Sequence, residues 1–79
     1  MLELYQFESC PYCQRVREVL SELEVDYICR NVRYGTPKWE QFVELNPNGQ
    51  VPFLVDKEKG IAMDESEAII AYLEKNYAR

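Results

Sequence analysis

Residues 2–31, LELYQFESCPYCQRVREVLSELEVDYICRN, set the topology of this 79-residue chain. Leu2, Leu4 and the Tyr5–Phe7 segment are typical of a strand. The helix expected after them opens at Ser9 or Cys10, with Pro11 in its first turn. Its apolar residues at helical spacing are Val16, Val19, Leu20 and Leu23, while Arg15, Arg17, Glu18 and Glu22 are expected to face water as surface charges. A second strand at about Asp26–Asn31 follows at once. A strand–helix–strand unit of this length predicts parallel pairing of the two strands, with a right-handed crossover between them.

A second helix is predicted after a turn at Tyr34-Gly35. Thr36 is a suitable N-cap, and Pro37 suits the first helical position because its missing N–H would be unpaired there in any case. The residues expected on the buried face of this helix are Trp39, Phe42, Val43 and Leu45. Asn46-Pro47-Asn48-Gly49 ends the helix, because it combines turn residues with a helix breaker.

The remainder of the chain predicts a hairpin and a last helix. Val51–Val55 and Gly60–Met63 flank a charged turn, which indicates an antiparallel pair. The last helix is expected to open at Asp64, with Glu67 reaching back to form a capping box. Its expected buried face consists of Ala68, Ile69, Tyr72 and Leu73. The order βαβ–αββα predicts an α/β fold, a four-stranded mixed sheet flanked by three helices, with residues 1–79 forming one domain.

Composition and charge exclude several classes of function. The hydrophobic content of 47% is enough for a compact core, and the formal net charge of −5 makes nucleic acid a poor partner. No apolar stretch approaches the roughly 20 residues that span a bilayer, so no membrane association is expected. Met1–Phe7 is short, carries a charge and does not resemble a signal peptide. We therefore expect a cytoplasmic protein.

Two cysteines stand at the junction of the first strand and the first helix, in Cys10-Pro11-Tyr12-Cys13. Thiols three positions apart at the first turn of a helix lie on one face and can close into a small disulfide ring. The unpaired N–H groups of a helix start carry partial positive charge, which stabilises a thiolate. Because the thiolate is the form that attacks disulfides, the segment predicts a redox site.

Three other interpretations of the cysteine pair are less well supported. Zinc usually needs four Cys or His ligands, but the chain has no His and one further cysteine, Cys29, so no metal is expected. A structural disulfide suits secreted proteins, whereas three cysteines that leave one unpaired fit a reducing compartment. Coincidental spacing of two core cysteines is the last alternative. Cys29 alternates within the second strand and is expected to be an inert, partly buried thiol.

Three separated elements of the chain resemble a known fold family. Cys10-Pro11-Tyr12-Cys13, Val51-Pro52 and Glu65-Ser66 are similar to the corresponding elements of glutaredoxins, which have the thioredoxin-like fold. The longer segments Asn46–Leu54 and Glu65–Leu73 look like the N-terminal domain of glutathione transferases. The chain therefore resembles a glutaredoxin active site on a transferase-style glutathione cradle.

The chain also departs from both families. Phe7 stands where many glutaredoxins carry a lysine, three residues before the first cysteine. Met63–Ser66 takes the place of the Gly-Gly-x-Asp segment that many glutaredoxins have. The all-helical second domain of transferases, which holds their electrophilic substrate, is not expected here.

The resemblance implies roles for the residues at the thiols and at the proline. Cys10, nearer the helix start and with its sulfur more open to solvent, is the expected nucleophile, and Cys13 is the expected resolving thiol. Pro11 would limit the flexibility of the ring. Tyr12 would either flank the bound peptide or be an ordinary exposed turn residue. The family also implies a cis peptide at Val51-Pro52, with the backbone of Val51 bound to the cysteine part of glutathione.

The two ends of glutathione are expected to lie against other residues. A helix N-terminus is a favourable carboxylate site, so Ser66 would bind the γ-glutamyl carboxylate while Glu65 pairs with the amino group. Gln50 is a candidate for the edge of the pocket. Lys38 and Trp39 are weaker candidates for the glycine end, since a tryptophan at this spacing is more often a core residue and such a lysine is more often a surface charge.

The expected function is a glutathione-dependent thiol–disulfide oxidoreductase. Its substrates would be protein disulfides or glutathionylated proteins, with glutathione as co-substrate and a monomeric chain. A minimal glutathione transferase is one alternative. A glutathione-assisted iron–sulfur cluster carrier is another, although Pro11 beside the nucleophile argues against it. A partner-docking domain without turnover is the last, and the intact thiols speak against it.

Overall fold

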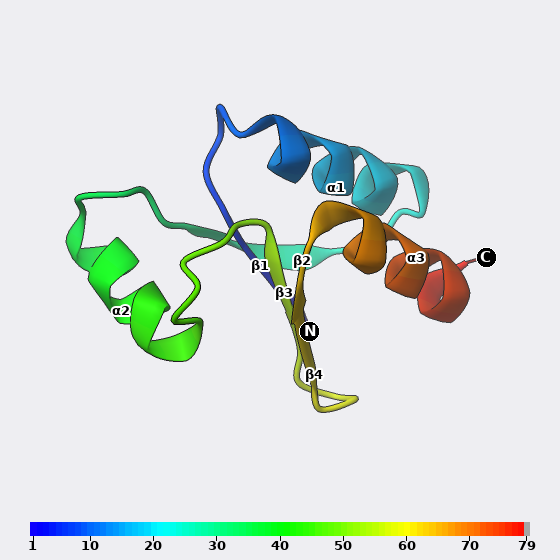
Figure 1. Cartoon of the computed structure of the whole chain (residues 1–79). Helices are drawn as coiled ribbons and strands as arrows, with labels where there is room; N and C mark the ends of the chain where they lie inside the picture. Colours follow the sequence, from blue (N-terminus) through cyan, green and yellow to red (C-terminus); the bar gives the residue numbers. More distant parts are fainter. Residues whose placement is uncertain (79) are drawn as a thin grey trace.

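The computed structural model describes residues 1–78 and contains the predicted element order (Figure 1). The elements are β1 (Leu2–Gln6), α1 (Pro11–Glu22), β2 (Tyr27–Asn31), α2 (Pro37–Leu45), β3 (Phe53–Asp56), β4 (Ile61–Asp64) and α3 (Ser66–Tyr77). The strand order in the sheet is β2-β1-β3-β4. β1 and β2 are parallel, whereas β1–β3 and β3–β4 are antiparallel. The prediction of a mixed four-stranded sheet with three helices is confirmed.

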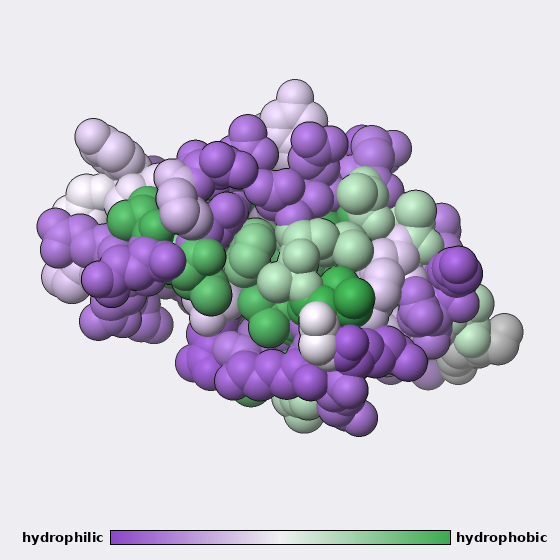
Figure 2. Space-filling model, turned by 60° about the horizontal axis from the view of Figure 1, so that its bottom comes forward, coloured by the Kyte–Doolittle hydropathy of each residue, from purple (hydrophilic) through white to green (hydrophobic). Residues whose placement is uncertain are grey.

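The helices divide between the two faces of the sheet. Figure 1 shows α1 and α3 side by side on one face, and α2 alone on the other. The buried residues under α1 and α3 are Leu2, Leu4, Val16, Leu20, Leu54, Ile69 and Leu73. A second, smaller cluster of Val32, Phe42 and Phe53 lies beneath α2. Because the single helix α2 covers its face incompletely, a group of apolar side chains is visible at the centre of the view in Figure 2, surrounded by polar ones.

The predicted starts of α1 and α2 are confirmed. Cys10 is the N-cap of α1 and Pro11 occupies the first turn. Thr36 is the N-cap of α2, where its hydroxyl accepts a hydrogen bond from the Trp39 N–H at 3.2 Å. In both helices the proline adds no unsatisfied donor, because the first N–H groups of a helix have no partner within it.

The predicted start of α3 is wrong. Asp64 is the last residue of β4 and pairs with Phe53, so it is extended and cannot cap the helix. Glu65 is the N-cap instead, with φ of 72°, and it makes no side-chain capping hydrogen bond. The capping box expected from Asp64 and Glu67 is therefore absent from this helix start. Pairing within the hairpin, which extends to Asp64, overrides the local capping preference.

Two residues expected on buried helix faces are exposed. Leu45 is 50% exposed, because it lies at the last turn of α2, beyond the cluster around Phe42. Ala68 is also exposed, while its neighbour Ile69 is buried against the core shared by α1 and α3. The periodicity located the two helices correctly, but the face of α3 is centred on Ile69 and Leu73.

The far end of α3 is attached to the sheet by a buried carboxylate. Asp56, at the end of β3, is 1% exposed and accepts hydrogen bonds from the hydroxyls of Tyr72 at 2.7 Å and Tyr77 at 2.6 Å. Burial raises the pKa of Asp56, but the two hydroxyls, together with a backbone hydrogen bond at Lys59 and the charge of Lys59, hold the pKa below its usual value. Burial and the same carboxylate raise the pKa of Tyr72 to about 12.

A membrane-spanning element is not found in the described part of the chain. None of its helices combines the length and the apolar character needed to cross a bilayer.

Candidate functional site

One groove brings together most of the residues that the sequence singled out. It has a volume of about 710 Å³, which is in the range of small-molecule sites. Its lining residues are Phe7, Cys10, Pro11, Tyr12, Trp39, Gly49, Gln50, Val51, Pro52, Glu65, Ser66 and Glu67. The groove lies where α1 and α3 begin and where the chain enters β3. We call it the thiol groove.

Cys10 is in the thiol groove, and Cys13 lies behind it. Both are free thiols, and the Sγ of Cys10 accepts a hydrogen bond from the backbone N–H of Cys13 at 3.3 Å. Cys10 is 5% exposed and Cys13 is fully buried, so Cys10 is the more exposed of the two, as expected. The sulfur of Cys10 is nevertheless less open than the sequence suggested, because the residue caps its own helix.

The environment of Cys13 keeps that thiol protonated. Burial and the hydrogen bond with Cys10 raise the pKa of Cys13 to about 12. A backbone hydrogen bond at Phe7 and the charge of Arg17 act in the opposite direction, but they are weaker. At neutral pH, Cys13 is therefore a thiol. This state suits a group that reacts second, after its neighbour has been converted to a disulfide.

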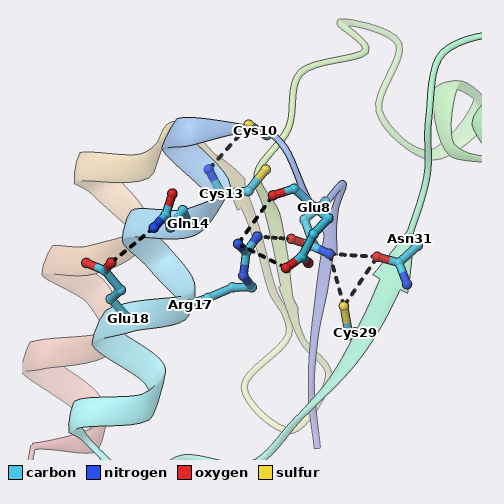
Figure 3. A network of polar contacts seen from close by, with 9 residues as sticks. Glu8, Cys10, Cys13, Gln14, Arg17, Glu18, Cys29 and Asn31 are labelled. Atoms are coloured by element: carbon cyan, nitrogen blue, oxygen red, sulfur yellow. Dashed lines mark hydrogen bonds and ion pairs between the residues drawn. The ribbon is translucent and has the colours of Figure 1, made fainter.

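The loop between β1 and α1 is held by Arg17 (Figure 3). The Arg17 guanidinium donates to the side-chain carbonyl of Gln6 and to the backbone carbonyl of Glu8, the latter at 3.4 Å. It also forms an ion pair with the Glu8 carboxylate at 3.8 Å. Arg17 was expected to be a surface charge, but its side chain is only 19% exposed. Sequence reasoning missed this role, because it depends on where the loop before Cys10 folds back.

The same network extends to the edge of the sheet. Gln6, fully buried, donates to Asn31 Oδ1 at 2.6 Å and to Cys29 Sγ at 3.1 Å. Figure 3 shows Cys29 beside Asn31 on β2, away from the thiol pair. Cys29 is exposed, so the expectation of a partly buried thiol is wrong. The reason is that β2 is an edge strand, whose residues from Ile28 to Asn31 are all exposed.

The loop before β3 forms a second wall of the groove. The Val51-Pro52 peptide is cis, as the resemblance implied. Pro52 is buried, whereas Gln50 is exposed on the rim of the groove. Asn46, which the sequence analysis did not single out, donates from its side chain to the Gln50 carbonyl at 3.2 Å. This bond connects the C-cap residue of α2 to the loop.

Gly49 in the same loop requires both its conformation and its lack of a side chain. Its φ is +65°, which is in the left-handed region that favours glycine. A Cβ at this position would lie 3.3 Å from Cζ2 of Trp39 and 3.7 Å from Cγ1 of Val43. The indole of Trp39 therefore packs directly on the backbone of the loop, and both line the thiol groove.

The start of α3 forms the third wall. Ser66 is 8% exposed, and Glu65 is exposed beside it. The carbonyl of Glu65 accepts from the N–H of Ile69 at 3.0 Å, but its side chain caps none of the first N–H groups. Glu67 forms an ion pair with Arg15 at 2.5 Å, between α3 and α1. A helix N-terminus without a side-chain cap is suited to bind a carboxylate.

The two candidates for the glycine end of glutathione are separated in the structure. Trp39 lines the thiol groove, whereas Lys38 does not. Lys38 lines a neighbouring groove on the other side of Phe7. Within residues 1–78, no group of three or more His, Cys, Asp or Glu side chains is placed to hold a metal ion.

Comparison with known proteins identifies the family. A family model described as "Glutathione S-transferase, N-terminal domain" matches residues 4–79. The chain belongs to this family. The thioredoxin-like α/β fold is thereby confirmed, since solved glutathione transferases superpose on nearly the whole chain.

Individual members of the family are moderately similar in sequence and closely similar in structure. A zeta-class glutathione S-transferase from Euphorbia esula is 37% identical over 78 residues, covering 96% of this chain and 34% of the relative. Glutathione transferase E6 from Drosophila melanogaster has a TM-score of 0.85 at 34% identity, covering 99% of this chain and 36% of that one.

A further structure contains the ligand that the resemblance implied. Glutathione transferase URE2P6 from Phanerochaete chrysosporium, in complex with oxidized glutathione, has a TM-score of 0.83 at 32% identity. It covers 96% of this chain and 36% of the solved chain. This chain spans about a third of the length of these relatives.

The family that is shown is that of the transferases. Of the two resemblances stated from the sequence, the one to the transferase N-terminal domain is therefore confirmed. Glutaredoxin-type chemistry, which rests on the Cys10-Pro11-Tyr12-Cys13 segment, stays a prediction.

Proposed function

We propose that the chain binds glutathione in the thiol groove and uses Cys10 to exchange disulfides with it. The observation that carries the proposal is the position of the Cys10 sulfur, between the cis Val51-Pro52 loop and the uncapped start of α3. Membership of the glutathione S-transferase family supports glutathione as the co-substrate. Ser66 and Glu65 would bind the γ-glutamyl end of glutathione. Trp39 and Gln50 would lie against its other end.

The proposed reaction has two exchange steps. The thiolate of Cys10 attacks the glutathione sulfur of a mixed disulfide, which forms a Cys10–glutathione disulfide and releases the substrate thiolate. A second glutathione thiolate then attacks this intermediate, giving oxidised glutathione and regenerating the Cys10 thiolate. Alternatively, Cys13 loses its proton and attacks Cys10, which releases glutathione and leaves a Cys10–Cys13 disulfide. The high pKa of Cys13 favours the first route at neutral pH.

Conjugation of glutathione to an electrophile is the second candidate. Family membership favours it, because the chain belongs to the transferase N-terminal-domain family and is similar to a zeta-class glutathione S-transferase. In that reaction the glutathione thiolate attacks a carbon centre, and Cys10 would act only as a neighbour of the glutathione sulfur. The proposed partners therefore differ: a disulfide-containing or glutathionylated protein in the first case, and a small electrophile in the second.

One set of assays separates the two candidates. Reduction of a small glutathione mixed disulfide, coupled to glutathione reductase, is measured for the parent chain, Cys10→Ser and Cys13→Ser. Conjugation of 1-chloro-2,4-dinitrobenzene is measured for the same three proteins. We expect disulfide turnover that is lost with Cys10→Ser and retained with Cys13→Ser. Conjugation without disulfide turnover in the parent would overturn the proposal in favour of the transferase reaction.

A further inference from the structure

A second groove adjoins the thiol groove at Phe7, which lines both. Its volume is about 600 Å³, and the loop between β2 and α2 forms its rim. Two cationic residues, Arg33 and Lys38, line it together with one acidic residue, Glu8. We call it the basic groove. It contains neither cysteine of the thiol pair, and the exchange steps described above do not use it.

The rim of the basic groove is held in place by backbone hydrogen bonds. The Val32 N–H donates to the Gln6 carbonyl at 2.9 Å, so the parallel pairing of β1 and β2 continues up to the groove. Both the N–H and the hydroxyl of Thr36 donate to the Arg33 carbonyl, at 3.1 and 2.6 Å. The Arg33 guanidinium lies over the ring of Phe7, 5.8 Å from its centroid. Its charge is therefore located at the junction of the two grooves.

The charges of the basic groove are available to an anionic ligand. Arg15, Arg17, Arg30 and Lys57 form ion pairs with acidic side chains. Arg33 and Lys38 form none with any residue in the described range 1–78. Glu8 is the acid in this groove, and its carboxylate is already paired with Arg17. The chain as a whole has a net charge of −5. Two unpaired cations in the groove next to that of Cys10 therefore form a local region of positive charge.

The thiol groove has the opposite charge. Its charged lining residues are Glu65 and Glu67, both acidic, and Glu67 is already paired with Arg15. Because the uncapped start of α3 is assigned to the γ-glutamyl end of glutathione, an acidic side chain of a disulfide-containing partner is favoured on the side of Phe7.

We propose that the basic groove binds an acidic side chain next to the cysteine of a protein or peptide substrate, while Cys10 attacks its disulfide. The proposal rests on the proposed function, because it names the substrate class of that reaction. Preferred substrates are mixed disulfides of glutathione with cysteines that have a neighbouring aspartate or glutamate. Arg33 supplies the charge nearest to the thiol groove, and Lys38 the charge farther along the rim.

The test compares two peptides that differ in one residue. Each is a glutathione mixed disulfide of the same short peptide, with glutamate beside the cysteine in one and glutamine in the other. We expect the parent chain to show about a fivefold higher kcat/KM for the glutamate peptide, which corresponds to two partly exposed charge interactions. The preference is expected to shrink as salt is added, because both cations are exposed.

The variants identify the residues responsible. Arg33→Gln with Lys38→Gln is expected to remove the preference and leave kcat/KM for the glutamine peptide unchanged. Lys59→Gln with Lys75→Gln changes the net charge by the same amount away from the groove, and should keep the preference. Equal kcat/KM for the two peptides in the parent would overturn the inference.

Two further outcomes are distinguishable from this one. If the parent turns over neither peptide nor a small mixed disulfide, the proposed function itself fails. If the Arg33 and Lys38 double variant raises the KM for glutathione and keeps the peptide preference, the cations serve the glycine carboxylate of glutathione. That result would also overturn the inference.

Discussion

Two helix starts face the thiol groove, and they are built in opposite ways. At α1, Cys10 has an extended backbone, with φ of −77° and ψ of 117°, and its sulfur accepts the N–H of Cys13. At α3, Glu65 has φ of 72° and caps no N–H with its side chain. The first start directs its partial positive charge at a sulfur of the protein itself. The second leaves its donors to a ligand.

The difference indicates where the fold tolerates strain for the sake of a site. A non-glycine residue in the left-handed region costs on the order of 1 kcal/mol, and such residues cluster at binding sites. Glu65 bears this cost on the rim of the groove, whereas Cys10 bears none. If the two starts have the proposed roles, substitutions at α1 should act mainly on chemistry and those at α3 mainly on affinity.

The largest expected effect is at the start of α1. Cys10→Ser should lower kcat/KM for a glutathione mixed disulfide by more than about 100-fold, because a hydroxyl does not replace a thiolate nucleophile. Serine is a good N-cap, so the free energy of unfolding should change by less than about 1 kcal/mol. Steady-state kinetics and urea unfolding measure the two quantities. A loss of stability as large as the loss of rate would show that Cys10 acts as a cap.

The C-terminal end of α3 should contribute more to the free energy of unfolding than its uncapped start does. Asp56→Asn is expected to lower the free energy of unfolding by about 2–3 kcal/mol, because it weakens the hydrogen bonds of two largely buried hydroxyls. Exposed Asp26→Asn is the matched control. Glutathione affinity, measured by calorimetry, should not change in either variant, since both residues lie outside the groove.

The same carboxylate predicts how stability depends on pH. The pKa of Asp56 is lower in the folded chain than the unfolded value of about 3.9, so its stabilising contribution is complete above that pH. The contribution is lost as the pH falls through the folded pKa. For Tyr72, whose folded pKa is raised to about 12, the contribution is complete below about pH 10 and is lost as the pH rises. Unfolding in urea at a series of pH values should show both limbs in the parent, and Asp56→Asn should flatten them.

Substitution of Arg17 tests whether the start of α1 depends on the hydrogen bonds that Arg17 makes to the loop before Cys10. Arg17→Met leaves the buried carbonyl oxygen of Gln6 without its donor, and should cost about 2 kcal/mol of stability. It also removes a cation near Cys13, so the pKa of that thiol should rise further, and the release of glutathione from a Cys10–glutathione disulfide by Cys13 should become slower. The matched control is Arg15→Met on the same helix, which removes one exposed ion pair. A stability loss with an unchanged rate of this release would restrict Arg17 to a structural role.

At the start of α3, the hydroxyl of Ser66 is predicted to contribute to affinity. Ser66→Ala should weaken glutathione binding by about tenfold, the usual effect of losing a hydrogen bond to a charged group. Stability should change little. Ser21→Ala, on the exposed face of α1, is the control. Unchanged affinity for Ser66→Ala would place the glutathione carboxylate elsewhere.

The smallest effect is expected at Glu65. Glu65→Gly removes the backbone cost of the left-handed conformation, and should raise the free energy of unfolding by up to about 1 kcal/mol. Affinity for glutathione should fall, because the carboxylate that we propose to pair with its amino group is lost. Glu24 also has a positive φ, of 56°, at the end of α1, far from the groove. Glu24→Gly should therefore have no effect on affinity, and a common loss in both variants would contradict the assignment.

Much of this arrangement was predictable from the sequence. Apolar spacing located α1, α2 and α3, and the resemblance implied both the cis Val51-Pro52 peptide and the groove around Cys10. The start of α3 was not predictable locally, because Asp64 is a preferred N-cap residue and Glu65 is not. Only the pairing of Asp64 with Phe53 across the hairpin decides between them.

Long-range geometry explains the other errors. Cys29 looked half-buried because its strand alternates, but alternation does not reveal that β2 lies at the edge of the sheet. Arg17 looked like a surface charge, because its partners Gln6 and Glu8 belong to a different element. The family assignment was divided for a related reason: the segment Cys10–Cys13 indicates one chemistry, while the rest of the chain matches the transferase N-terminal domain.

The contact between Gly49 and Trp39 has a consequence for the way this groove can be redesigned. A library that randomises the residues lining the groove would be free to vary exposed positions such as Tyr12 and Gln50. At Gly49, an added Cβ would require the indole to move by a few tenths of an ångström, and the left-handed backbone there favours glycine over residues with a side chain. Selection for new ligands should therefore return glycine at this position repeatedly, while the neighbouring positions diverge.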